Sequence, residues 1–96
     1  DHGKQARVAL GWPETPDYSH LSLKLGNTVA AIETALNNKD IIVGTIDDYT
    51  FLNTTIILRN VKPNYMREAK RTAREVANKL LPEFNILIFA ESTDRD

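Results

Sequence analysis

The apolar positions of this chain recur with two periods, and each period is typical of one kind of secondary structure. Near the start, residues 5–12 alternate, with Val8, Leu10 and Trp12 on one side and smaller or polar residues on the other. This alternation predicts a β-strand. Pro13 ends the strand, because proline has no N–H group to donate to a neighbouring strand. A proline-rich connector then leads to the next element.

The stretch from His20 to Leu36 fits two different elements. With a period of two, leucines at alternate positions predict a strand over residues 20–25, followed by a helix that Asn27 caps. With a period of 3.6, one stripe spans about 120° of a helical wheel and predicts a single helix over residues 19–37. The stripe consists of Leu21, Leu25, Thr28, Val29, Ile32, Ala35 and Leu36.

We favour the single helix, because its stripe collects more of the large apolar residues than the strand does. Asp17 and Ser19 supply residues that can cap its first turn. Gly26 then lies inside the helix, on its polar side, where glycine costs about 1 kcal/mol relative to alanine. Leu23 is the one large apolar residue outside the stripe. The short strand before a helix remains the alternative.

A hairpin follows the helix. Residues 41–46 and 49–60 are predicted strands, and Asp47 and Asp48 between them predict a tight turn. The second strand is long for one element, so we expect a bulge at residues 52–53. Short, mostly polar turns of this kind join antiparallel strands.

The second half of the chain predicts a helix and a last strand. The helix begins at Pro63 and Asn64, and Pro82 prevents its continuation. Its apolar positions repeat with helical spacing at Ala69, Ala73, Val76, Ala77 and Leu80. Residues 84–90 then form the last predicted strand. The expected order is therefore β-α-β-β-α-β.

That order predicts an α+β domain with a ferredoxin-like βαββαβ topology. In this arrangement a four-stranded antiparallel sheet carries both helices on one face, and its first and third strands are central. Ninety-six residues with 42% hydrophobic and 26% charged residues are enough for one domain over residues 1–96 with a modest core. No apolar run approaches the roughly 20 residues that a membrane helix needs.

Composition and motifs exclude several functions that this topology commonly has. The chain has no cysteine, and His2 and His20 lack metal-ligand spacing, so we expect no metal and no cofactor. An RNA-recognition module needs a pattern of aromatic residues on its central strands. The predicted third strand offers Phe51, but threonines and isoleucines follow it, so this aromatic pattern is absent.

The candidate catalytic residues have simpler structural explanations. Ser19 and His20 are adjacent, and neighbouring residues on a helix point about 100° apart rather than toward each other. Asp47 and Asp48 are the best paired carboxylates, yet neighbouring aspartates are far more common as turn formers. We therefore expect a protein that is not an enzyme.

Charge is unevenly distributed along the chain. The net charge is −1, but residues 59–79 hold seven Lys or Arg residues and two Glu, so this segment is strongly basic and the remainder is acidic. One stripe of the second helix carries most of this charge at i, i+3, i+4 and i+7, with the members Arg67, Lys70, Arg71 and Arg74. Such a stripe can bind phosphates of a nucleic acid or another anion, or it can be an ordinary solvated helix face.

The predicted sheet has more apolar residues than one covered face needs. If both helices lie on one face, the other face should be polar, but both parities of the strands carry large aliphatic residues. We therefore expect an exposed apolar sheet face that forms an interface with a second copy or with another protein domain. The expected interface residues are Ile41, Val43, Ile57, Leu87 and Phe89.

The leading hypothesis is a non-catalytic protein-interaction or assembly module. The alternative is a module that binds nucleic acid or an anionic ligand through the basic stripe. The chain starts at Asp1 and its only methionine is Met66, so we expect a processed chain or a piece of a larger protein. We favour an extracytoplasmic domain of an exported or membrane-anchored protein.

Overall fold

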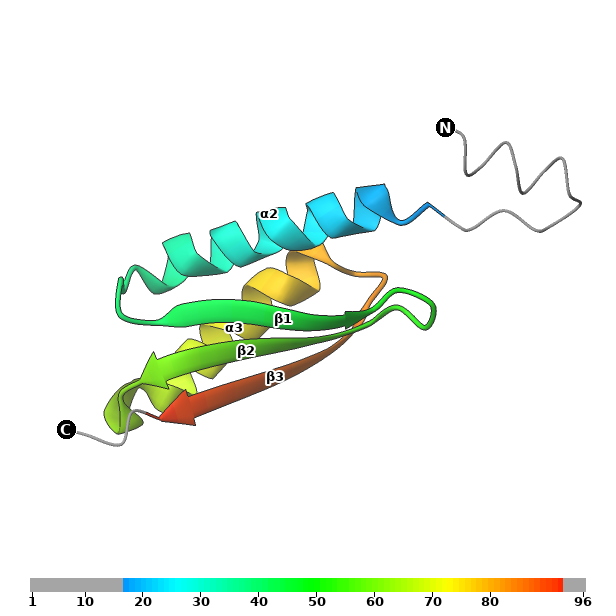
Figure 1. The fold of residues 1–96 in the computed structure, drawn as a ribbon. Helices are drawn as coiled ribbons and strands as arrows, with labels where there is room; N and C mark the ends of the chain where they lie inside the picture. Colours follow the sequence, from blue (N-terminus) through cyan, green and yellow to red (C-terminus); the bar gives the residue numbers. More distant parts are fainter. Residues whose placement is uncertain (1–16, 93–96) are drawn as a thin grey trace, which may run out of the picture.

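A computed structural model describes residues 17–92 of the chain, and the predicted strand at residues 5–12 lies outside this range. Two α-helices and three strands follow one another, with a short 3-10 helix before the second α-helix (Figure 1). The elements are α2 (Ser19–Leu36), β1 (Ile42–Asp48), β2 (Asn53–Val61), η1 (Pro63–Tyr65), α3 (Met66–Leu80) and β3 (Asn85–Ser92). The described part is therefore an α+β domain.

The sheet has the strand order β1-β2-β3. β1 pairs antiparallel with β2 through a hairpin, and β2 pairs parallel with β3. The parallel pair follows from the connection through α3, which returns the chain to the end of the sheet where β2 began. Both helices lie on the same face of the sheet (Figure 1).

The expected four-stranded, ferredoxin-like arrangement is not confirmed. That arrangement puts the first predicted strand beside the third, and the last strand away from it. In the structure the last strand lies directly beside β2 and runs parallel to it, so it occupies the place expected for the first strand. Two helices on one face are confirmed, but a wholly antiparallel sheet is wrong for the described strands.

α2 is one helix that continues through Gly26, as the 3.6-residue period predicts. Asp17 accepts a hydrogen bond from the backbone N–H of Ser19 at 2.9 Å, which satisfies one free donor of the first turn. At the other end Asn37 takes the left-handed conformation, with φ 50°, that commonly ends helices. The buried residues of α2 are Leu21, Leu25, Thr28, Ile32 and Leu36.

The edges of the predicted stripe in α2 differ from the expectation. Val29 is only half-buried and Ala35 is exposed, so the stripe that reaches the core is narrower than the wheel suggests. Leu23 is 68% exposed, as expected for the residue outside the stripe. The helix therefore covers the sheet with a single row of large side chains.

α3 packs through alanines rather than large side chains. Ala69, Ala73 and Ala77 are fully buried, and such small residues let a helix approach its neighbours closely. Leu80 was expected in the core but is 37% exposed, whereas Leu81 is fully buried. The reason is that Leu81 leaves the helical conformation (φ −126°, ψ 59°), so the chain turns its side chain inward there.

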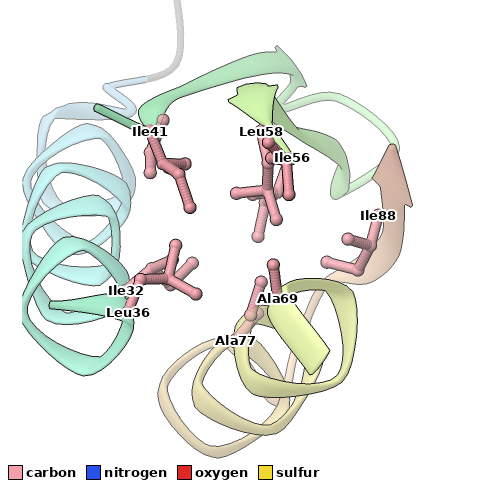
Figure 2. Close-up of a cluster of buried hydrophobic side chains, with 11 residues drawn as sticks. Ile32, Leu36, Ile41, Ile56, Leu58, Ala69, Ala77 and Ile88 are labelled. Carbon is pink, nitrogen blue, oxygen red and sulfur yellow. The ribbon is translucent and has the colours of Figure 1, made fainter. Parts of the chain in front are cut away.

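The main core lies between the sheet and the two helices. Figure 2 shows side chains of α2, α3, the strands and the residue before β1 converging on one space. Ile56 and Leu58 of β2 are fully buried at its centre. A second cluster at the hairpin end joins Leu21 and Leu25 to Leu81 and Phe84. Each helix and strand therefore contributes the side chains of one of its faces to the core.

The hairpin turn lies further along the chain than predicted. β1 continues through Asp48, and residues 49–52 make the turn instead of Asp47 and Asp48. The Asp48 carboxylate accepts hydrogen bonds from the backbone N–H groups of Thr50 and Phe51 at 3.1 and 3.4 Å. Leu52 has a positive φ of 54° within this turn, so residue 52 belongs to the turn rather than to a bulge in the strand.

One ion pair joins α2 to the segment before β3. Lys24 Nζ donates a hydrogen bond to Glu83 Oε2 at 2.6 Å. This hydrogen bond, together with one from the backbone of Glu83, lowers the pKa of the Glu83 carboxyl. Both side chains are partly exposed, so the contact orients the helix more than it stabilises the fold.

Alanine substitutions at two isoleucines distinguish the two faces of the sheet. Ile56→Ala removes a fully buried side chain, and we expect it to lower the free energy of unfolding by about 2 to 5 kcal/mol. Ile46→Ala makes the same change at a residue that is 66% exposed, and the expected loss is below about 1 kcal/mol. Urea unfolding measures both values. Equal losses would contradict this assignment of the faces.

Gly26→Ala tests the continuity of α2. A Cβ at Gly26 would meet no atom within 4 Å, so alanine gains helix propensity without a steric cost. We expect the free energy of unfolding to rise by about 0.5 to 1 kcal/mol in urea unfolding. A decrease in the free energy of unfolding would contradict a continuous helix and favour the alternative, in which a short strand over residues 20–25 ends before Gly26.

Candidate functional site

The face of the sheet opposite the helices exposes large apolar side chains. We call Ile42, Ile46, Ile57, Leu87 and Phe89 the open face. Four of them are among the most exposed large hydrophobic residues of the described chain, namely Ile42 at 61%, Ile46 at 66%, Leu87 at 61% and Phe89 at 51%. Ile57 is half-buried between them on the central strand. Singly exposed apolar residues are ordinary, but a contiguous group on one face marks an interaction surface.

The strand register makes this group contiguous. Gly44 on β1 lies opposite Ile57 on β2, and Ile57 lies opposite Phe89 on β3. In the next row of the same face, Ile46 and Leu87 flank Thr55. Neighbouring strands are about 4.8 Å apart, so the side chains of each row are within contact range. The open face therefore crosses all three strands.

Polar residues border the open face at both ends of the strands. At one end Arg59 and Glu91 form an ion pair, with 3.9 Å between Nε and Oε1. At the other end the side-chain amide of Asn85 donates a hydrogen bond to Asn53 Oδ1 at 3.1 Å. An apolar centre with a polar rim is the usual composition of a protein–protein interface.

A shallow hollow lies between β1 and β2 on this surface. Its volume is about 190 Å³. Gly44 forms part of its floor, because glycine has no side chain between Ile42 and Ile46, and Ile57 and Arg59 line the β2 side. A cavity of about 150 Å³ admits a benzene ring, so the hollow has room for one large side chain of a partner. Anchor side chains in such hollows often carry much of the binding energy.

Two of the predicted interface residues lie on the other side of the sheet. Ile41 and Val43 were expected on the open face, but they are buried beside the helices in the main core. Ile57, Leu87 and Phe89 lie on the open face as expected. None of these placements tests binding, so the interface itself remains a prediction.

Ile42 and Ile46 are the residues that the sequence argument missed. The signal was present, because residues opposite each other in a hairpin point to the same face. Every pair between β1 and β2 joins an even-numbered residue of β1 to an odd-numbered residue of β2 or the reverse. A turn at Asp47 and Asp48 would have produced the same parity. The face of Ile57 therefore had to contain the even-numbered residues of β1.

The basic stripe lies on the outer surface of α3. Arg67, Lys70, Arg71 and Arg74 are all exposed, and they lie away from the alanines that face the core. Arg71 is partly neutralised, since its guanidinium lies 3.7 Å from Glu68 and 3.8 Å from Glu75. No ion pair links the other three to a carboxylate within residues 17–92. The stripe and the open face therefore lie on opposite sides of the domain.

The candidate catalytic residues have structural roles. Asp17 and Ser19 hydrogen-bond to each other at the start of α2, and His20 is exposed beside them. Asp47 accepts hydrogen bonds from the Thr45 and Thr54 hydroxyls at 3.1 and 2.8 Å, and Asp48 holds the hairpin turn. Successive residues of a strand point to opposite faces, so the two aspartates do not form a pair.

The described residues also contain no group of three or more His, Asp or Glu side chains that could hold a metal ion. His2, the other histidine, lies outside that range. Helices α2 and α3 are not long and apolar enough to cross a membrane.

Comparisons of the chain with protein-family models, with curated proteins and with solved structures found no match.

Proposed function

We propose that this domain is a non-catalytic interaction module that associates with protein through its open face. The observation that carries the proposal is the contiguity of Ile42, Ile46, Leu87 and Phe89 around the half-buried Ile57. Large exposed apolar groups are unfavourable in water, and burial of each one is worth about 1.5 to 3 kcal/mol. A domain that keeps several of them on one rigid sheet gains free energy when a partner covers them.

A second copy of the chain is the partner with the best support. At one end of the open face Arg59 is paired with Glu91, and at the other Asp48 is bound by the hairpin turn, so charge alone does not draw two copies together. Two copies can still pack face to face, because the apolar centre of one open face matches that of another. Two sheets pack in this manner about 10 Å apart, with their inner side chains interdigitated. In the other version of the proposal the partner is a neighbouring domain whose contact surface is apolar at its centre and polar at its ends.

The first test replaces two open-face residues by threonine, which keeps β-propensity but removes apolar area. In sedimentation equilibrium we expect the average mass of the parent chain to rise with concentration, and the Leu87→Thr/Phe89→Thr variant to stay monomeric. Leu23→Gln is the matched control, because Leu23 is equally exposed but lies on α2. The control should associate like the parent. A parent that stays monomeric up to about 1 mM contradicts self-association.

The alternative function is binding of nucleic acid or another polyanion by the basic stripe. It is supported by the charges of Arg67, Lys70 and Arg74, which follow one another along one side of α3 and form no ion pair within residues 17–92. The described chain offers no aromatic side chain within the stripe on which a base could stack, so binding would rest on phosphate contacts. This alternative predicts weak affinity with little sequence preference.

Charge reversal tests the alternative. The chain should bind a single-stranded oligonucleotide at low salt, and the logarithm of the affinity should fall with the logarithm of the salt concentration by about 0.7 for each phosphate contacted. The variant Arg67→Glu/Arg71→Glu/Arg74→Glu should lose this binding in a fluorescence-anisotropy titration. Lys39→Glu, at an exposed residue outside α3, should lose little. Absence of binding by the parent at about 50 mM salt contradicts the alternative.

A further inference from the structure

The hollow between β1 and β2 exists because one residue of the sheet has no side chain on the open face. Gly44 lies opposite Ile57, and Ile57 lies opposite Phe89, so the side chains of this row grow larger from β1 to β3. A Cβ at Gly44 would meet no atom within 4 Å, so the space above this glycine is free within the described part of the chain. The hollow has a volume of about 190 Å³.

Phe89, at the other end of this row, has a side chain that fits the hollow. It is the largest side chain of the open face and is 51% exposed. Its ring is the size of benzene, which a cavity of about 150 Å³ holds. Phe89 and Gly44 of one copy lie on the two outer strands, roughly 10 Å apart at about 4.8 Å per strand, with Ile57 between them. Phe89 therefore does not reach the hollow of its own copy.

We propose that two copies pack open face on open face about a two-fold axis along β2, and that Phe89 of each copy fills the hollow at Gly44 of the other. Rotation about this axis exchanges the outer strands, so β3 of one copy lies over β1 of the other while the rows stay level. The contact then occurs twice, as every contact does in a two-fold interface. This inference rests on the proposed function, because it states how a second copy binds to the open face.

The neighbouring rows of the open face fit the same arrangement. On one side of the Gly44 row, Leu87 of one copy lies over Ile46 of the other, so two exposed apolar side chains cover each other. On the other side, each Glu91 lies over β1 of the facing copy, beside its Arg59, so the two ion pairs meet with opposite charges adjacent. Sheets that pack face to face keep their strand directions within about 30° of each other, which this axis allows.

A two-fold axis perpendicular to the strands fits the row less well. Along the row of Gly44, such an axis places Phe89 over Phe89 and one hollow over the other, so the largest side chains collide while both hollows stay empty. Shifted to lie between this row and the next, it places Phe89 over Leu87, and only the shorter Ile46 faces the hollow. Unfilled hollows forfeit packing contacts. Side-chain size therefore favours the axis along β2.

Gly44→Leu tests the proposal, because it fills the hollow with an apolar side chain. If association depended on apolar area alone, this variant would associate more tightly than the parent. The proposal predicts the reverse. In sedimentation equilibrium the dissociation constant should rise at least about tenfold, because both Phe89 rings lose their place. The double variant Gly44→Leu/Phe89→Ala should recover most of the lost affinity, because the new leucine then faces an alanine.

Thr55→Val is the matched control, because it adds apolar area in the next row of the same face at a residue that does not line the hollow. It should associate at least as tightly as the parent. Urea unfolding checks that Gly44→Leu still folds, and its free energy of unfolding should not fall, since a Cβ at Gly44 meets no atom. A short-range NMR contact between the Phe89 ring and the Gly44 α-hydrogens, in a mixture of labelled and unlabelled chains, gives a second readout.

The outcomes separate this arrangement from self-association itself. A parent chain that stays monomeric up to about 1 mM contradicts both. A parent that associates, and that Leu87→Thr/Phe89→Thr makes monomeric, supports self-association through the open face. If Gly44→Leu then associates as tightly as that parent, only the arrangement is overturned. The arrangement is also overturned if Gly44→Leu weakens association but the double variant does not restore it, because Phe89 is then not the side chain in the hollow.

Discussion

Ile56 and Leu58 of the central strand β2 are the side chains on which the rest of the structure depends. Both are fully buried, and α2, α3, β1 and β3 all contribute neighbours around them. A strand so buried needs a neighbour on each side for its backbone groups and a layer of side chains over one face. The hairpin with β1 and the crossover through α3 supply the neighbours, and the alanine face of α3 supplies close cover. The fold follows from the need to enclose this one row of residues.

The same constraint leaves the second face of the sheet uncovered. Two helices have enough apolar side chains for one layer only, because α2 contributes a single row and α3 contributes mainly alanines. Four side chains of the open face, each more than half exposed, would release roughly 4 to 7 kcal/mol per copy if they were fully buried. Two copies together would gain about 8 to 14 kcal/mol, against an association cost of about 4 to 15 kcal/mol. Self-association through this face alone is therefore expected to be weak and dependent on concentration.

The helices were more predictable than the sheet. The 3.6-residue period placed α2 through Gly26 and within one residue of its observed end, because a long amphipathic stripe is a redundant signal that one glycine cannot cancel. Turn chemistry was misleading at Asp47 and Asp48, since aspartates also end strands and hold the turn that follows them. Strand order could not be read from the chain, because the helical connection between β2 and β3 is long enough to reach either a neighbouring or a distant position.

The choice of interface residues failed for a related reason. β1 reads Ile42, Val43, Gly44, Thr45 and Ile46 after Ile41, so both parities hold aliphatic residues and hydrophobicity alone does not select a face. Only the pairing with β2 selects it, because Gly44 lies opposite Ile57. On β2 and β3 the parity of Ile57, Leu87 and Phe89 also contains polar residues such as Arg59 and Glu91, and these three residues lie on the exposed face as expected. Local pattern determined the elements, and pairing between elements determined the surface.

The open face and the outer edge of β3 have different consequences for association. Pairing through an edge is open-ended, because each added strand presents a new edge, whereas packing of two faces ends when both faces are covered. Association through the open face therefore ends at a defined stoichiometry, whereas association through the edge of β3 would not. Leu87 and Phe89 lie on β3 itself, so an interface that covers the open face would also approach this edge.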